Sequence, residues 1–93
     1  MATDIEAARC LLYNVGRMID NGYTPRIESA QAKLFASQVS WRAVNSSMIV
    51  HAGFGFTKDF HIERIYRDQK LSQLYGGSED TQRLIISGGI LAK

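Results

Sequence analysis

The sequence predicts an all-α protein, an antiparallel helical bundle of about four helices that forms one domain over residues 1–93. Three observations favour this class. Apolar residues recur at intervals of three and four along most of the chain, as they do on the buried face of a helix. Turn signals divide these stretches into four segments, with a single proline in the chain. No segment sustains the alternation of apolar and polar residues that is typical of a strand.

The first segment predicts a helix over residues 4–20. Thr3 and Glu6 have the spacing of a capping box, in which a hydroxyl and a carboxylate satisfy free amides of the first turn. Asn21 and Gly22 tolerate positive φ and should end the helix. Between these signals lies an apolar stripe formed by Ile5, Ala8, Leu12, Val15 and Ile19.

A second helix should follow at once and form the buried central rod. Thr24 suits the capping position, and the fixed φ of Pro25 suits the first helical residue. The segment is apolar on more than one side, which is typical of a helix with several neighbours. One face carries Ile27, Ala30, Leu34, Trp41, Val44 and Met48, and the next carries Ala32, Phe35, Ala36, Val39 and Ala43.

Glycine and phenylalanine alternate over residues 52–57, where we expect an aromatic, packed loop. A third helix fits residues 62–74, with Asp59 as its cap and with Gly76 and Gly77 as its end.

The last helix should begin after Ser78, because serine is a favoured capping residue. The carboxylates of Glu79 and Asp80 in its first turn complement the positive end of the helix dipole. Gly88 and Gly89 should terminate it.

Composition excludes several classes of function. The chain carries 11 basic and 9 acidic residues in an interspersed pattern, so its net charge of +2 predicts no nucleic-acid partner. Its apolar runs are far shorter than the roughly 20 residues of a membrane span, and no leader precedes them. Cys10 is the only cysteine, so neither an internal disulfide nor a metal site is indicated. We expect a reducing compartment, the cytoplasm, or the mitochondrial matrix in a eukaryote.

Two regions could carry chemistry. In residues 75–78 (YGGS) a helix start follows two glycines, so exposed amides could bind an anion or the polar edge of a ring. The alternative is a tight turn between helices. The second region is His51 with the glycine and phenylalanine loop. Its alternative is a satisfied histidine at the C-terminal end of a helix.

Arg64, Arg67 and Lys70 recur every third residue and could contact phosphates. Glu63 and Asp68 alternate with them, so a solvated, ion-paired face is the competing interpretation. Order and spacing indicate neither a nucleophile with its base nor a pair of facing carboxylates. No catalytic residue is assigned.

Taken together, these segments resemble the C-terminal helical domain of the acyl-CoA dehydrogenase family, in order and separation, across nearly the whole chain. The stretches that carry the resemblance are 32–37 (AKLFAS), 51–57 (HAGFGFT), 62–68 (IERIYRD), 73–78 (QLYGGS) and 82–84 (QRL). Family members are several times as long and also have a helical N-terminal domain and a β-domain. We therefore expect a piece of a longer protein, the alternative being a natural small protein derived from this domain.

The resemblance implies that the complete protein is an FAD-dependent oxidoreductase of fatty acid metabolism. Such enzymes remove a proton from the α-carbon of an acyl-CoA thioester and a hydride from its β-carbon, which leaves the enoyl thioester. Most members take the base from a glutamate at the position of Gly76, a residue that cannot accept a proton. Some branches take it from an earlier helix instead, so this chain alone should be inactive.

The resemblance also implies two sets of contacts with FAD. The first set is Tyr75, Gly77, Ser78 and Asp80, and the second is His51 and Gly53. The second set approaches the cofactor of a neighbouring subunit, which implies a homo-oligomer, a dimer or a tetramer.

Three positions depart from the family pattern. Ile49 replaces a glutamine that hydrogen-bonds the cofactor, Ala52 replaces the first of two glycines, and Gly88 replaces an arginine. The implied partners are an acyl-CoA substrate and an acceptor like the electron-transfer flavoprotein. The departures favour an alternative, a non-catalytic helical assembly or binding module that retained the bundle but lost FAD and the base.

Overall fold

The computed structural model describes residues 1–92 and contains four α-helices and one short 3₁₀ helix, η1. The bounds in chain order are Ala2–Asp20 for α1, Arg26–His51 for α2, Ala52–Phe56 for η1, Ile62–Leu71 for α3 and Glu79–Leu91 for α4. The predicted all-α fold of about four helices is confirmed.

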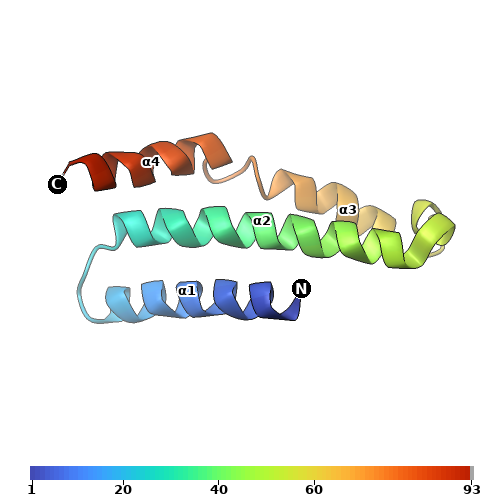
Figure 1. The fold of residues 1–93 in the computed structure, drawn as a ribbon, viewed down its shortest axis with the longest axis horizontal. Helices are drawn as coiled ribbons and strands as arrows, with labels where there is room; N and C mark the ends of the chain where they lie inside the picture. Colours follow the sequence, from blue (N-terminus) through green and yellow to red (C-terminus); the bar gives the residue numbers. More distant parts are fainter. Residues whose placement is uncertain (93) are drawn as a thin grey trace.

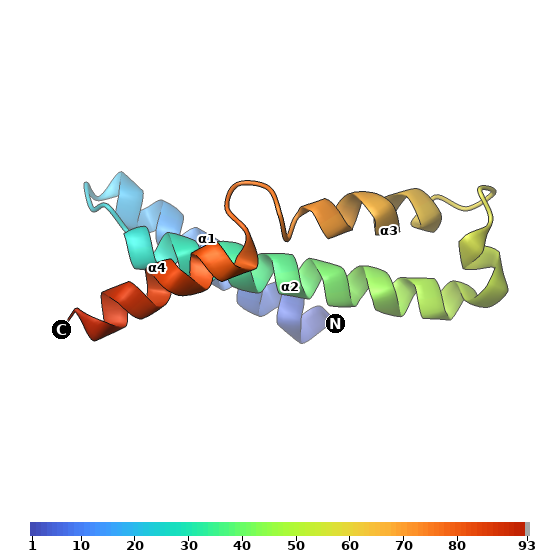
Figure 2. The ribbon, with the colours of Figure 1, turned by 90° about the horizontal axis from the view of Figure 1, so that it is seen from above.

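Helix α2 is the central rod, as predicted. α1 packs along one side of it, and α3 and α4 follow one another along the other side, all antiparallel to α2 (Figure 1). Among the described residues α1 contacts neither α3 nor α4, so the helices form an open layer, seen from above in Figure 2. The radius of gyration over Cα atoms is 15.7 Å, whereas a compact chain of this length has about 12 Å.

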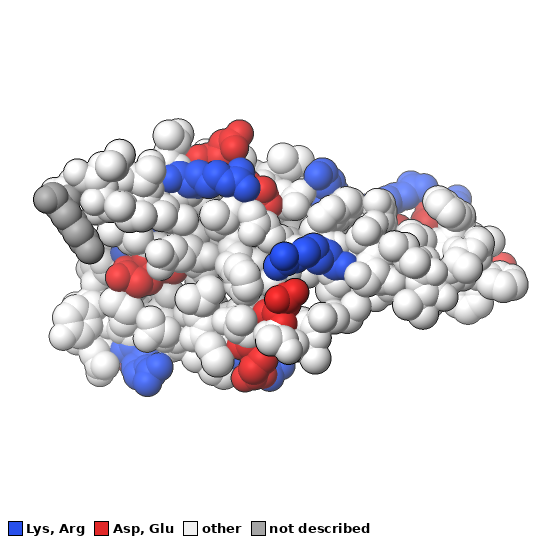
Figure 3. Space-filling model, in the orientation of Figure 1, with Lys and Arg blue, Asp and Glu red and all other residues white. Residues whose placement is uncertain are grey.

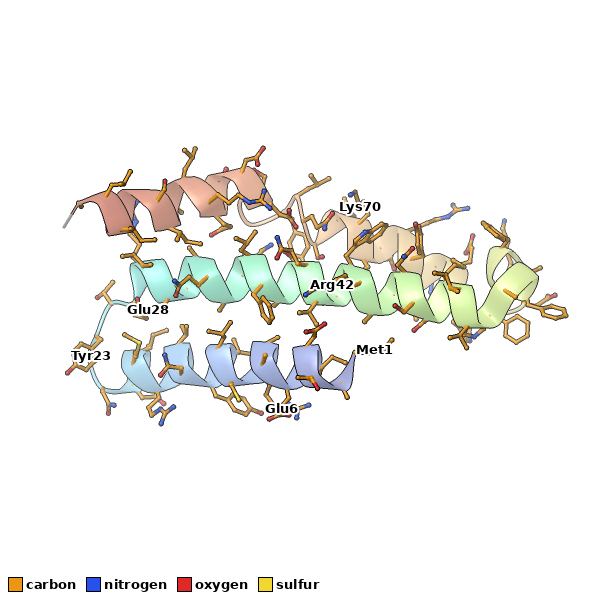
Figure 4. All side chains as sticks on the ribbon, in the orientation of Figure 1. Met1, Glu6, Tyr23, Glu28, Arg42 and Lys70 are labelled. Atoms are coloured by element: carbon orange, nitrogen blue, oxygen red, sulfur yellow. The ribbon has the colours of Figure 1, made fainter. Side chains whose placement is uncertain are left out.

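An open layer leaves only a small core, made mostly of small side chains. Its apolar members are Val15, Ala30, Ala32, Val39 and Ile62. Within residues 1–92 no side chain is fully buried, and many large apolar side chains are exposed. Figure 4 shows Arg42 of α2 beside the start of α1, where its guanidinium lies 3.9 Å from the carboxylate of Asp4.

The surface charge agrees with the interspersed pattern of the sequence. On the face drawn in Figure 3, basic and acidic side chains alternate over the helices without forming a patch of one sign. None of the helices in residues 1–92 combines the length and the apolar character that crossing a membrane requires.

The predicted caps of the first two helices are wrong. α1 already begins at Ala2, so Thr3 lies inside the helix and makes no capping bond. α2 begins at Arg26, one residue later than predicted, and Pro25 occupies the capping position. The Arg26 N–H donates to the backbone carbonyl of Thr24, at 3.0 Å, and not to its hydroxyl. Pro25 is buried, and its φ of −81° and ψ of +76° lie outside the helical region, so the helix begins after it.

Helix α3 is also shorter than predicted. Its capping position is held by His61 and not by Asp59, and it ends at Leu71. Beyond that point the N–H groups of Leu74 and Tyr75 both donate to the Leu71 carbonyl at 2.9 Å. These turns satisfy the last carbonyls of the helix before the glycine pair is reached.

Helix α4 starts at the predicted cap, Ser78, but does not end where expected. Gly88 and Gly89 lie inside the helix. Neither glycine takes the positive φ with which glycine usually ends a helix. Gly89 instead lies against α2, where a Cβ atom would clash with Cδ1 of Ile27. The absent side chain at Gly89 is what lets α4 approach α2 this closely.

The expectation of a packed loop at residues 52–57 is wrong. η1 occupies most of this segment, and the side chains of Phe54 and Phe56 are 67% and 81% exposed. Phe54 keeps one edge contact, with the ring of Phe60 at 5.9 Å between centroids. Ala52 has φ +53° and ψ −137°, a backbone region that glycine prefers.

Candidate functional site

The connection between α3 and α4, residues 72–78, is the candidate cofactor site. Gly76 and Gly77 have φ of +66° and +98°, which L side chains rarely adopt. The Ser78 hydroxyl then accepts the N–H of Thr81 at 3.3 Å and caps α4. The glycine turn before a capped helix that the sequence predicts is therefore present.

The turn leaves several backbone donors free. Within the described chain, the N–H groups of Gly76, Gly77 and Ser78 have no acceptor, whereas the Glu79 N–H donates to the Gln73 carbonyl at 3.2 Å. Three adjacent free donors at a helix start favour a ligand that accepts hydrogen bonds.

The charges beside the turn decide which ligand suits it. The carboxylates of Glu79 and Asp80 occupy the first turn of α4, where they already complement the helix dipole. Both pair with Arg83, at 3.4 and 3.2 Å. A phosphate would meet these two carboxylates, so the turn suits the neutral polar edge of a ring better than an anion.

Two side chains that sequence reasoning missed hold this connection in place. The Lys33 ammonium, on α2, donates to the Ser72 carbonyl at 2.5 Å and lies 5.2 Å from the centroid of the Tyr75 ring. Gln82, on α4, is 7% exposed and donates to the carbonyls of Gly76 and Gly77 at 3.3 and 3.4 Å. The connection is thus gripped from both neighbouring helices.

A signal for Gln82 did exist in the sequence. It stands three and four residues before Ile85 and Ile86, so a polar side chain falls on the apolar face of the last helix. Lys33 has no comparable signal, because its partner Ser72 is 39 residues away.

The second candidate region lies elsewhere. His51 ends α2, where its Nδ1 atom is 2.8 Å from the Ser47 carbonyl. Its ring and the ring of Phe60 pack edge to face, with 5.7 Å between their centroids. These contacts agree with the alternative interpretation of this region, in which His51 is a satisfied histidine at the end of a helix. Gly53 has open space around its backbone, since a Cβ atom there would meet nothing within 4 Å. The length of α3, about 15 Å for ten residues, separates this region from the connection, so one chain does not join the two.

The remaining candidates make no hydrogen bond to the glycine turn, although Lys70 donates to the side chain of Gln73, in the connection, at 2.8 Å. Arg67 pairs with Glu63 at 3.0 Å, and Lys70, labelled in Figure 4, lies 4.8 Å from the centroid of the Trp41 ring. This agrees with the ion-paired interpretation of the α3 face. Among residues 1–92 no group of three or more metal-binding side chains is present. Gly76 offers no proton acceptor at the position where the resemblance implies a base.

These features define the class of protein: a helical domain, open on its broad faces, with a glycine turn that presents backbone donors. The family model of the acyl-CoA dehydrogenase C-terminal domain matches residues 1–91. The chain belongs to this family.

Known proteins resemble the chain over its whole length. It is 36% identical to the Caffeyl-CoA reductase-Etf complex subunit CarC of Acetobacterium woodii, over 100% of the chain and 24% of the relative. It is 40% identical to an acyl-CoA dehydrogenase of Bacillus subtilis, over 98% of the chain and 24% of the relative. The structure of butyryl-CoA dehydrogenase from Megasphaera elsdenii matches 98% of the chain and 24% of that protein, with a TM-score of 0.94 and 31% identity. The chain thus spans about a quarter of the length of these relatives.

Proposed function

We propose that the complete protein containing this chain is an FAD-dependent acyl-CoA dehydrogenase, which oxidises acyl-CoA thioesters between the α- and β-carbons. The chain supplies FAD contacts and part of an oligomer interface. The observation that carries the proposal is the glycine turn with free N–H groups at Gly76, Gly77 and Ser78, in a chain of this family.

The residues of the connection fit the flavin part of FAD. The isoalloxazine ring has a polar edge of carbonyl and nitrogen acceptors, and the donors of Gly77 and Ser78 match them. Tyr75 and Asp80 flank these donors and complete the set that the resemblance implies. FAD, when bound, supplies the acceptor for the hydride that leaves the β-carbon. The chain's own contribution is to orient the ring with fixed backbone dipoles.

The base must come from another part of the complete protein. Gly76 has no side chain, and the carboxylates nearest to it in sequence, Glu79 and Asp80, are paired with Arg83. We therefore assign proton abstraction to a carboxylate outside these 93 residues.

We further propose that the complete protein forms a homo-oligomer, a dimer or a tetramer, in which His51 and Gly53 reach the FAD of a neighbouring subunit. The exposed backbone at Gly53 and the exposed rings of Phe54 and Phe56 support this proposal. So does a groove of about 540 Å³ between α1 and α2, whose lining includes Leu12 and other apolar side chains left uncovered.

The relatives suggest partners as well as a reaction. CarC is described as a subunit of a complex that includes Etf, so we propose an acceptor like the electron-transfer flavoprotein. An acyl-CoA is the proposed substrate, and the cytoplasm, or the mitochondrial matrix in a eukaryote, is the proposed location.

Two observations favour a second candidate, a non-catalytic assembly module. Ile49, which stands where the resemblance implies a cofactor-binding glutamine, is 70% exposed and offers no hydrogen bond. Ala52 also has a backbone conformation suited to glycine. The resemblance implies a glycine here, beside the cofactor, and the Cβ atom of Ala52 adds bulk where the backbone should approach FAD closely.

Titration of FAD into the complete protein separates the two functions. A protein that binds FAD with a perturbed flavin spectrum supports the dehydrogenase, and one that binds none supports the module. The variant Gly77→Ala should weaken FAD binding roughly tenfold, because alanine is strained at φ +98° and its Cβ atom would meet Gln82. Gly16→Ala on α1, with open space around it, is the matched control and should bind FAD as the parent does.

A further inference from the structure

We infer that Lys33 and Gln82 are positioning residues, which together set the backbone geometry of the connection, residues 72–78. Their contacts with it, the grip, come from two helices: Lys33 reaches across from α2, and Gln82 reaches back from α4. The inference rests on the proposed function only in its consequence for flavin, since the grip itself lies within this chain.

Lys33 acts at the end of α3. The last carbonyls of a helix have no partner inside the helix, and a lysine ammonium can satisfy one of them. The Ser72 carbonyl is such a group, and Lys33 donates to it at 2.5 Å. The same ammonium lies over the Tyr75 ring, so one side chain fixes both the start of the connection and the residue before the glycine pair.

Gln82 acts on the glycine pair itself. Its amide nitrogen donates to the carbonyls of both Gly76 and Gly77, which directs the N–H groups of the turn away from α4. A Cβ atom on Gly77 would clash with that nitrogen, so a side chain at this position would push the Gln82 amide away from the turn. Because Gln82 is buried, its amide has few other partners with which to exchange these bonds.

The grip predicts a local effect, which hydrogen exchange of single amides can measure in this chain. Two amides report on it: Tyr75 N–H, inside the connection and bonded to the Leu71 carbonyl, and Glu79 N–H, directly after the connection and bonded to the Gln73 carbonyl. Val39, buried in α2, serves as the reference for global unfolding.

Two variants remove the grip. Lys33→Met should accelerate exchange at Tyr75, and Gln82→Met should accelerate it at Glu79, each roughly tenfold more than at Val39. Gln82→Glu should behave like Gln82→Met, because a carboxylate cannot donate to two carbonyls. Lys33→Arg keeps donors and charge and should restore most of the protection.

The control is Gln31→Met, on the exposed face of α2, which should leave the exchange ratio unchanged. Equal acceleration at Tyr75, Glu79 and Val39 would show that the two residues are merely structural and would overturn the inference. No acceleration would overturn it as well. If Gln82→Met does not fold, Lys33→Met and its rescue by arginine decide the question.

The same variants in the complete protein test the consequence for flavin. Both should shift the absorption bands of bound FAD and weaken its binding roughly tenfold. Accelerated exchange with an unchanged flavin spectrum would refute the proposed contact between flavin and the connection, yet it would support the grip. The failure of the inference and the failure of the proposed function are thereby distinguished.

Discussion

Two neighbouring glycines in α4 provide a stringent test of how this layer is packed. Gly88 faces open space, whereas a Cβ atom on Gly89 would clash with Cδ1 of Ile27 and lie 2.5 Å from its Cγ1. Replacing either glycine with alanine makes the same chemical change in the same helix. The two variants therefore differ in one respect, the contact between α4 and α2.

The magnitudes follow from this geometry. Alanine stabilises a helix interior by about 1 kcal/mol relative to glycine, and Gly88→Ala should gain this amount in full. Gly89→Ala gains the same but must displace Ile27, whose β-branched side chain has one strongly preferred χ1 rotamer in a helix. Overpacking of this kind costs about 1–3 kcal/mol, so the net effect is a loss of about 1 kcal/mol. The two free energies of unfolding should differ by about 2 kcal/mol.

Urea unfolding of the purified chain measures this difference. Far-UV circular dichroism reports the helices, and fluorescence of Trp41, the only tryptophan, reports the contact of α2 with α3. Coincident transitions by both probes justify a two-state treatment. Equal stability of Gly88→Ala and Gly89→Ala would refute the close approach of the two helices.

Three further substitutions test local features. Ala52→Gly should raise stability by about 1 kcal/mol, because relief of the strain at φ +53° outweighs the entropy that glycine loses, and thermal unfolding should show a higher Tm. Ser78→Ala should lose about 1 kcal/mol with the cap of α4, measured by urea unfolding; an unchanged midpoint would contradict the capping bond. Thr3→Ala should not destabilise the chain, because Thr3 lies inside α1 and caps nothing; a loss like that of Ser78→Ala would restore the capping box.

The sequence predicts those features of the fold that depend on neighbouring residues. Gly22 takes φ +87° after α1, and Ser78 caps α4, because turn and cap chemistry act within a few residues. The apolar pattern on several sides of α2 likewise predicts its central place. These features need no knowledge of distant contacts.

The features that the sequence mispredicts depend on contacts between helices. A glycine pair usually ends a helix, yet Gly88 and Gly89 do not take positive φ, and Gly89 packs closely against Ile27 of α2 inside the helix. Phe54 and Phe56 look like core residues, but within the described chain the open layer leaves both rings largely exposed, and Phe54 keeps an edge contact with Phe60.

The candidate site likewise has one part that the sequence predicts and one part that depends on contacts between helices. The glycine turn is readable from the letters YGGS, whereas the grip on it is not. Lys33 and Ser72 are brought together only by the packing of α3 on α2, and no local pattern records their contact. Only the family resemblance implies that a base is expected at the position of Gly76, because a glycine by itself gives no such indication.

The most direct test of the central claim is anaerobic addition of an acyl-CoA to the FAD-loaded complete protein, followed by absorption spectroscopy. The proposed dehydrogenase predicts that the bands of oxidised flavin bleach as the enoyl thioester forms. A complete protein that holds FAD yet keeps these bands unchanged with acyl-CoA substrates of varied chain length would contradict the proposed activity.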